Sequence, residues 1–149
     1  LGGNGVYAGI AADARDFAFT QVLGLSSYPY FGYADPDDIP ADFFSRLVTD
    51  RGLPAMVLEG GWSSANVTGV SSSPEEQARY IRRQAALLDG IDARAWCHLL
   101  YADIDLASLP PPVPANLALF ARIGLADSDF QAKPALAEWD ALFARRLVG

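Results

Sequence analysis

Three short stretches of the sequence combine carboxylate and aromatic side chains, and each comes directly after an apolar run. Aromatic rings stack well on the C–H faces of pyranose sugars, and carboxylates accept hydrogen bonds from sugar hydroxyls. Cleavage of a glycosidic bond also needs two carboxyl groups, one ionised at the anomeric carbon and one protonated at the leaving oxygen. These residue types therefore favour carbohydrate chemistry. The candidate side chains are Ser26, Ser27, Tyr28, Tyr30, Glu59, Trp62, Ser63, Trp96, His98, Asp103 and Asp105.

The apolar runs that precede these stretches predict buried strands. They lie at 17–25, 53–59 and 93–101. Pro29 follows the end of the first run, and Gly60 begins the polar exit from the second. Runs of this length, bounded by proline and glycine, are typical of strands rather than of helices.

Helical patterns alternate with the apolar runs. A helix is expected at 41–51, where apolar residues recur at helical spacing before Gly52. A second helix is expected to begin after Ser73, an N-cap residue followed by Pro74, and to end at Gly90. Further helical segments are expected at 116–122 and 134–147.

The order strand, helix, strand, helix, strand, helix predicts an α/β fold of parallel βα units. Near-continuous apolar strands that alternate with amphipathic helices are typical of a parallel sheet covered on both faces. In such folds the working residues lie at the carboxyl ends of the strands. The three polar stretches should therefore meet at one edge of the sheet.

Charge argues against several classes of partner. The 149 residues hold 11 Lys and Arg against 18 Asp and Glu, a net charge of −7. No basic run is present to follow a phosphate backbone or an anionic membrane surface, so neither nucleic acid nor membrane is an expected partner. No stretch of about 18 apolar residues predicts a membrane span. No basic-then-apolar leader follows Leu1, so we expect no signal peptide in this sequence.

Neither a metal nor a cofactor is expected. Cys97 is the single cysteine and His98 the single histidine, which excludes both an internal disulfide and a Cys/His zinc site. The glycine-rich opening at 1–12 lacks the preceding strand and the spacing of a dinucleotide or phosphate-binding fingerprint.

Two stretches and the tail resemble a known enzyme clan. The segments Leu-Gly-Leu-Ser-Ser-Tyr-Pro at 23–29 and Pro-Ala-Met-Val-Leu-Glu-Gly-Gly-Trp at 54–62 resemble the sixth and seventh strands of retaining (β/α)8 glycoside hydrolases. That clan includes endo-galactanases, cellulases and mannanases. Ile-Gly-Leu-Ala-Asp at 123–127, with Lys-Pro-Ala at 133–135 and Trp139, resembles its closing segment. The resemblance covers about 16–147 and implies the C-terminal part of a TIM (β/α)8 barrel, approximately strands 6 to 8.

The resemblance implies roles for individual residues. Glu59 matches the catalytic nucleophile at the end of the seventh strand. Tyr28 matches a tyrosine that contacts this nucleophile, and Trp96 matches a tryptophan that packs beneath the bound sugar. Trp62, His98 and Asp103 are the further substrate-binding candidates. The implied substrate is a β-linked polysaccharide or oligosaccharide, and the implied location is extracellular or periplasmic.

One departure from the clan is clear in the sequence. The clan's acid/base glutamate follows an asparagine at the end of the fourth strand, and no Asn-Glu pair occurs here. A complete barrel also takes about 250 residues. We therefore expect 1–149 to be a single partial domain whose acid/base comes from a missing N-terminal part. Such a half-barrel would self-associate or pair with that part.

Two other interpretations stay open at this stage. The chain could be a catalytically incompetent half-barrel that binds carbohydrate or only folds, with Trp62 and Trp96 packed in the core and His98 a buried structural histidine. A serine hydrolase with Ser26 or Ser27 as nucleophile is disfavoured, because Tyr28 stands where the Gly-x-Ser-x-Gly elbow requires glycine.

Overall fold

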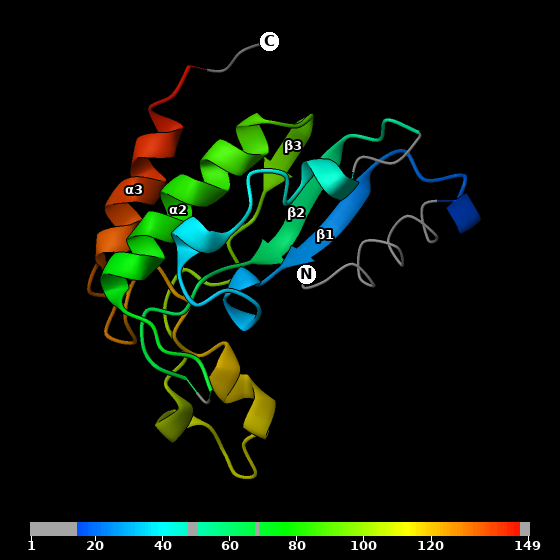
Figure 1. Ribbon diagram of the computed structural model, residues 1–149. Helices are drawn as coiled ribbons and strands as arrows, with labels where there is room; N and C mark the ends of the chain where they lie inside the picture. Colours follow the sequence, from blue (N-terminus) through cyan, green and yellow to red (C-terminus); the bar gives the residue numbers. More distant parts are fainter. Residues whose placement is uncertain (1–14, 48–50, 68, 147–149) are drawn as a thin grey trace.

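The computed structural model describes residues 15–47, 51–67 and 69–146. Three parallel strands pair in the order β1-β2-β3, and two α-helices lie on one side of this sheet (Figure 1). The predicted α/β class and the parallel pairing are confirmed. The strands are β1 at Leu23–Ser27, β2 at Ala55–Gly60 and β3 at Ala93–Trp96; the helices are α2 at Pro74–Asp89 and α3 at Pro134–Phe143. Short 3-10 helices span Pro29–Phe31, Pro36–Asp38, Ser45–Leu47, Leu106–Ser108 and Ala115–Leu119.

The helix α2 begins and ends where the sequence predicts. Ser73 accepts a hydrogen bond from the Glu76 amide at 3.2 Å, and Pro74 occupies the first turn. Glu75 and Glu76 place negative charge at the positive end of the helix dipole, which stabilises the first turn. Gly90 then follows as the C-cap.

The helix predicted at 41–51 does not form in its described part. Turns and the 3-10 helix Ser45–Leu47 occupy 41–47 instead. Phe43, Phe44 and Leu47, which produced the helical pattern, are all buried. Packing therefore satisfies these side chains without a regular helix, and so short a segment gains little from helix propensity alone.

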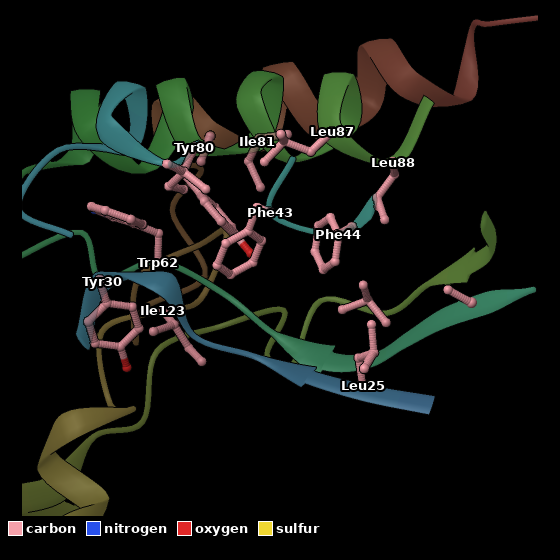
Figure 2. Packing of buried hydrophobic residues seen from close by; sticks show 14 of the residues in the cluster. Leu25, Tyr30, Phe43, Phe44, Trp62, Tyr80, Ile81, Leu87, Leu88 and Ile123 are labelled. Atoms are coloured by element: carbon pink, nitrogen blue, oxygen red, sulfur yellow. The ribbon is translucent and has the colours of Figure 1, made fainter. Parts of the chain in front are cut away.

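The core lies between α2 and the sheet. Figure 2 shows Phe43, Phe44 and Ile81 in the space between α2 and the strands. On the strands, Leu25 and Val57 point into this layer and are almost completely buried. The core follows from strand geometry, because alternate residues of each strand face the helix.

The opposite face of the sheet has no cover among the described residues. Gly24, Ser26 and Leu58 are exposed there, and Leu58 retains 57% of its accessible surface. The side chain of Leu58 leans over Gly24, where an added Cβ would lie 2.5 Å from the Leu58 Cδ1 atom. The expected two-sided cover is therefore wrong for this part of the chain, which buries only the face toward α2.

Some predicted features fall outside the described residues. These are the glycine-rich opening at 1–12, residues 48–50 of the first predicted helix and residue 147 at the end of the last. Within the described part, α3 ends at Phe143. A membrane-crossing helix would have to be longer and more apolar than any helix that the structure describes.

Gly124 lies where two distant segments meet closely. Ala102 and Ala126 form a parallel bridge beside it, and a Cβ on Gly124 would lie 2.4 Å from both the Ala102 carbonyl carbon and the Asp103 nitrogen. Backbone atoms cannot move aside as a flexible side chain does. This contact fixes the position of the segment after β3.

We predict that Gly124→Ala lowers the free energy of unfolding by about 2–3 kcal/mol, because the added methyl group overlaps the backbone. Gly90→Ala is the control, since a Cβ there meets no atom closer than 3.4 Å, and it should change stability by less than about 1 kcal/mol. Urea unfolding followed by tryptophan fluorescence measures both. Equal effects would contradict the close approach at Gly124.

Candidate active site

Glu59 owes its orientation to an irregularity in β2. Leu25 pairs with Val57, but the next residue of β1, Ser26, pairs with Glu59, so Leu58 is an extra residue in β2. Val57 faces the core, and simple alternation would turn Glu59 toward the core as well. The bulge instead places Glu59 opposite the exposed Ser26 and re-aims its carboxylate.

Glu59 and Tyr28 share a cleft of about 300 Å³ at the carboxyl ends of the strands. Burial, the negative charge of Glu59 and a hydrogen bond to the Glu59 carboxylate together raise the pKa of Tyr28 to about 12, and burial contributes most. The phenol therefore stays protonated and donates to Glu59. The resemblance implied a contact between these two residues, and the catalytic role of Glu59 stays a prediction. The remaining lining is Leu99, Leu100, Ile104, Leu117 and Phe120.

Aromatic rings surround Tyr28. Its ring centroid lies 5.0 Å from that of Phe120 and 6.2 Å from that of Phe31. Phe31 is 48% exposed, so part of this cluster faces solvent near Glu59. Exposed rings at a cleft with a carboxylate suit the faces of a sugar ring. Of these rings, Tyr28 and Phe120 line the cleft, and Phe31 packs against Tyr28.

Trp62 lies in the core and does not line the cleft. It is fully buried, and its indole stacks on Tyr80 with centroids 5.5 Å apart. The ring also meets Tyr30 edge to face, and its Nε1–H donates to the Ser72 hydroxyl at 2.9 Å. Figure 2 shows Trp62 between Tyr30 and Tyr80. The side chain is packed on all sides, so its faces are closed to a sugar.

Trp96 and His98 lie on the helix side of the sheet. Trp96 pairs with Val57, whose side chain faces the core, and the Trp96 ring packs 4.7 Å from Trp139 of α3. His98 follows two residues later, and its Nε2 lies 2.6 Å from the Ile123 carbonyl oxygen. The register of β3 therefore turns both rings away from Glu59, contrary to their predicted role in binding substrate.

His98 is neutral in this setting. Burial lowers its pKa, and the hydrogen bond to the Ile123 carbonyl only partly opposes that effect. Because a carbonyl only accepts, Nε2 holds the proton. His98 thus stabilises the 123–124 segment and is not paired with Ser26 or Ser27, which removes the base that a serine hydrolase would need.

Asp103 holds loops together rather than lining the cleft. Its carboxylate, 2% exposed, accepts from the Gly124 amide at 3.0 Å and from the Lys133 ammonium at 2.5 Å, and pairs with Arg122 at 3.4 Å. Lys133 also donates to the Ser64 hydroxyl and to the Gly124 carbonyl. This cluster, hereafter the Asp103–Lys133 cluster, joins the loops that follow β2 and β3 to the start of α3.

Gln77 of α2 supports the same region, and nothing in the sequence singled it out. Its side-chain nitrogen lies 2.9 Å from the Trp62 carbonyl and 3.0 Å from the carbonyls of Ile123 and Gly124. The apolar residues that line the cleft were also missed as site residues, because the segments 93–101 and 116–122 were interpreted only as a strand and a helix; they are Leu99, Leu100, Ile104, Leu117 and Phe120. Across the described ranges, no group of three or more His, Cys, Asp or Glu side chains is placed to hold a metal ion.

Comparison with known proteins identifies the fold. No protein-family model matches the chain, and no curated protein gives a significant sequence match. Solved structures do match. A β-D-glucuronidase from Dictyoglomus thermophilum superposes with a TM-score of 0.64 at 14% identity, covering 87% of this chain and 23% of its own. A GH2 β-galacturonidase from Eisenbergiella tayi, bound to galacturonate, superposes with a TM-score of 0.59 at 17% identity. The match covers 87% of this chain and 25% of the galacturonidase.

A third neighbour is a β-1,3-glucanosyltransferase from Rhizomucor miehei in complex with laminaritriose, with a TM-score of 0.50 and 21% identity over 77% of this chain and 42% of its own. At these identities the likeness shows the fold alone. The chain therefore has the fold of a segment found in glycoside hydrolases. It spans only about a quarter of the length of the glucuronidase and the galacturonidase.

We predict that Glu59→Gln lowers the pKa of Tyr28 from about 12, because it removes the negative charge and the anionic acceptor. Burial remains, so the pKa should stay above the ordinary tyrosine value. NMR titration of labelled tyrosine measures this, with Glu75→Gln on the exposed first turn of α2 as control. An unchanged titration in Glu59→Gln would show that the two side chains do not interact.

We predict that Asp103→Asn lowers the free energy of unfolding by about 3 kcal/mol, because it leaves the largely buried Lys133 ammonium without its anion. Asp105→Asn is the control: Asp105 accepts from the Ala107 amide at 3.0 Å, a bond that asparagine also makes, so the change should stay within about 0.5 kcal/mol. Chemical denaturation measures both. Unchanged stability in Asp103→Asn combined with lost sugar affinity would instead assign Asp103 to substrate binding.

Proposed function

We propose that this chain forms the nucleophile side of the active site of a retaining β-glycoside hydrolase, within the C-terminal part of a (β/α)8 barrel. The main support is the position of Glu59, which the bulge in β2 turns into the cleft beside Tyr28. The fold neighbours add independent support, because they include a β-glucuronidase and a β-galacturonidase.

The geometry fits the first step of a double displacement. The Tyr28 hydroxyl donates to one oxygen of Glu59, which fixes the carboxylate and leaves a lone pair on its other oxygen directed into the cleft. That oxygen attacks the anomeric carbon, the bond to the leaving oxygen breaks, and a general acid gives that oxygen a proton. Water then attacks the anomeric carbon of the glycosyl-enzyme, loses a proton to the same acid/base and releases Glu59.

The general acid belongs, in this proposal, to a part of the barrel outside these 149 residues. Glu59 is the one carboxylate among the described residues that lines the cleft. Asp103 is engaged by Lys133, and Asp105 accepts from the Ala107 amide. A retaining mechanism needs its second carboxyl about 5–5.5 Å away, so the complementary segment must approach the cleft closely.

The sheet offers a place for that complementary segment. The face with Ser26 and Leu58 is bare in the described structure, and β1 and β3 each have one unpaired edge. Free edges of parallel strands tend to acquire partners. We propose that further βα units of the same barrel occupy them, and that self-association of the isolated chain would use the same surface.

The substrate class follows from the cleft and from the neighbours. A β-linked polysaccharide or oligosaccharide suits exposed aromatic rings beside a carboxylate. The neighbours' names include both uronic acid glycosides and, for the glucanosyltransferase, laminaritriose. An extracellular or periplasmic location is the setting that such a substrate favours.

A carbohydrate-binding or structural module without catalysis is the second candidate. The observation that favours it is the absence of a second carboxylate from the described cleft lining. Under this alternative the isolated chain binds sugar through Tyr28, Phe31 and Phe120, and Glu59 only accepts hydrogen bonds from sugar hydroxyls.

We predict that Glu59→Gln, in the protein that contains the complete barrel, lowers kcat by about a thousandfold or more, because glutamine cannot displace the leaving group. Sugar affinity should change by less than about threefold, since the amide keeps the shape of the carboxyl and an acceptor oxygen. Glu75→Gln is the matched control and should retain full activity. Steady-state kinetics and calorimetric titration give the two values.

A second variant makes the test specific for the nucleophile. Glu59→Ala leaves space at the anomeric carbon, so added azide should restore turnover and produce a glycosyl azide of inverted configuration. Full activity in Glu59→Gln would contradict the assignment of Glu59 as the nucleophile. Equal activity loss without azide rescue would assign Glu59 to binding and favour the second candidate.

A further inference from the structure

The turn that follows β1 contains a second tyrosine, which the catalytic proposal does not use. Tyr30 is 2% exposed, and its ring packs against Phe31 and, edge to face, against Trp62. Its hydroxyl donates to the Leu119 carbonyl oxygen at 2.8 Å. Figure 2 shows the oxygen of Tyr30 directed away from Trp62. The two partners are 89 positions apart in the sequence, so this bond joins the turn after β1 to a segment that follows β3.

Burial keeps the Tyr30 hydroxyl protonated. Burial and, to a smaller extent, the neighbouring Tyr28 raise the pKa of Tyr30 well above its ordinary value. A carbonyl oxygen only accepts hydrogen bonds, so the phenol must donate. Tyr30 is therefore a permanent donor to Leu119 at neutral pH.

Residues 105–120 form a long excursion from the body of the fold. The Ile104 amide donates to the Ala121 carbonyl at 3.0 Å, which closes the base of the excursion. No residue from 105 to 120 is buried. Apart from the bond that Tyr30 makes, the hydrogen bonds of 105–120 in the described structure join residues at most three positions apart. A segment of this length without buried side chains has much conformational entropy to lose, so one distant anchor has a large effect on its position.

The anchored carbonyl lies next to residues of the cleft. Leu117 precedes it, Phe120 follows it, and both line the cleft that contains Glu59. The Tyr28 hydroxyl, from the same turn as Tyr30, is hydrogen-bonded to the Glu59 carboxylate. The two tyrosines of one turn therefore hold two different parts of the cleft, the carboxylate and the segment 115–120.

We propose that Tyr30 is a positioning residue of this site. Its hydroxyl holds the segment 115–120, so that Leu117 and Phe120 form a sugar-binding surface at a fixed position relative to Glu59. Tyr30 is packed in the core and is not part of the described cleft lining, so it acts through the segment and not by contact with the sugar. This inference rests on the proposed function, because it takes the cleft around Glu59 as the place where the sugar binds.

Removal of the hydroxyl alone tests the proposal in the protein that contains the complete barrel. Tyr30→Phe keeps the buried ring and removes the hydrogen bond. We expect the amides of 115–120 to exchange with solvent about fivefold faster, because one hydrogen bond contributes about that factor. Exchange of the α2 amides should stay within about twofold of the parent's. Hydrogen-exchange mass spectrometry measures both segments.

Kinetics of the same variant separate positioning from chemistry. For the glycoside used to assay Glu59→Gln, KM should rise about fivefold, since the bound sugar must then order the segment 115–120. The kcat should stay within about twofold, because Tyr28 and Glu59 are unchanged. Tyr33→Phe is the matched control, since this tyrosine packs edge to face on Phe43 and is not bonded to the segment in the described structure. Its exchange and its KM should stay within about twofold of the parent's.

The outcomes separate this inference from the proposed function. Faster exchange confined to 115–120, together with a raised KM, supports the inference. Equal exchange in Tyr30→Phe and the parent overturns it whatever the role of Glu59, and so does faster exchange with an unchanged KM. Equally faster exchange in α2 also overturns it, because the effect is then a general loss of stability. Full activity in Glu59→Gln, or no turnover of any glycoside, removes the proposed function, and the inference falls with it.

Discussion

The central strand β2 has to bury Ala55 and Val57 against α2 and, two residues later, present a carboxylate on the opposite side of the sheet. Strict alternation forbids this, because residues separated by two share a face. The extra residue Leu58 resolves the conflict, at the expense of one exposed leucine. The catalytic proposal depends on this bulge, since without it Glu59 would point toward the core.

Polar contacts, rather than regular structure, hold the other side of the cleft. After β3 ends at Trp96 the chain runs to α3 through loops and short 3-10 helices, which extend beyond the strand ends in Figure 1. The Asp103–Lys133 cluster, Gln77 and His98 all fasten these loops to the body of the fold. Ile123 and Leu125 of the same stretch are buried in the core, so apolar contacts add to these polar anchors.

Local sequence patterns predicted most of the helices and strands, whereas the register of the strands determines which side chains face the cleft. The capping signal at Ser73 located α2, and the apolar runs at 17–25 and 93–101 overlap β1 and β3 without matching their bounds. The helix predicted at 41–51 does not form in its described part, because packing, not helical spacing, explains the buried Phe43 and Phe44. Glu59 and Tyr28 line the same cleft, and their roles there stay predictions. Trp96 and His98 were misplaced because no local signal reveals which face a short strand turns to the core. The apolar residues that line the cleft come mostly from segments interpreted as a strand and a helix, so the sequence did not mark them as site residues.

Covalent trapping tests the nucleophile most directly. A fluorosugar glycoside with a good leaving group forms a glycosyl-enzyme that hydrolyses slowly, so intact mass and peptide mapping can locate the bond. The account predicts a single added fluoroglycosyl group on the peptide that contains Glu59, and none in Glu59→Gln. A label on Asp103, Asp105 or any carboxylate other than Glu59 would contradict it, as would an unlabelled protein that still hydrolyses the parent glycoside.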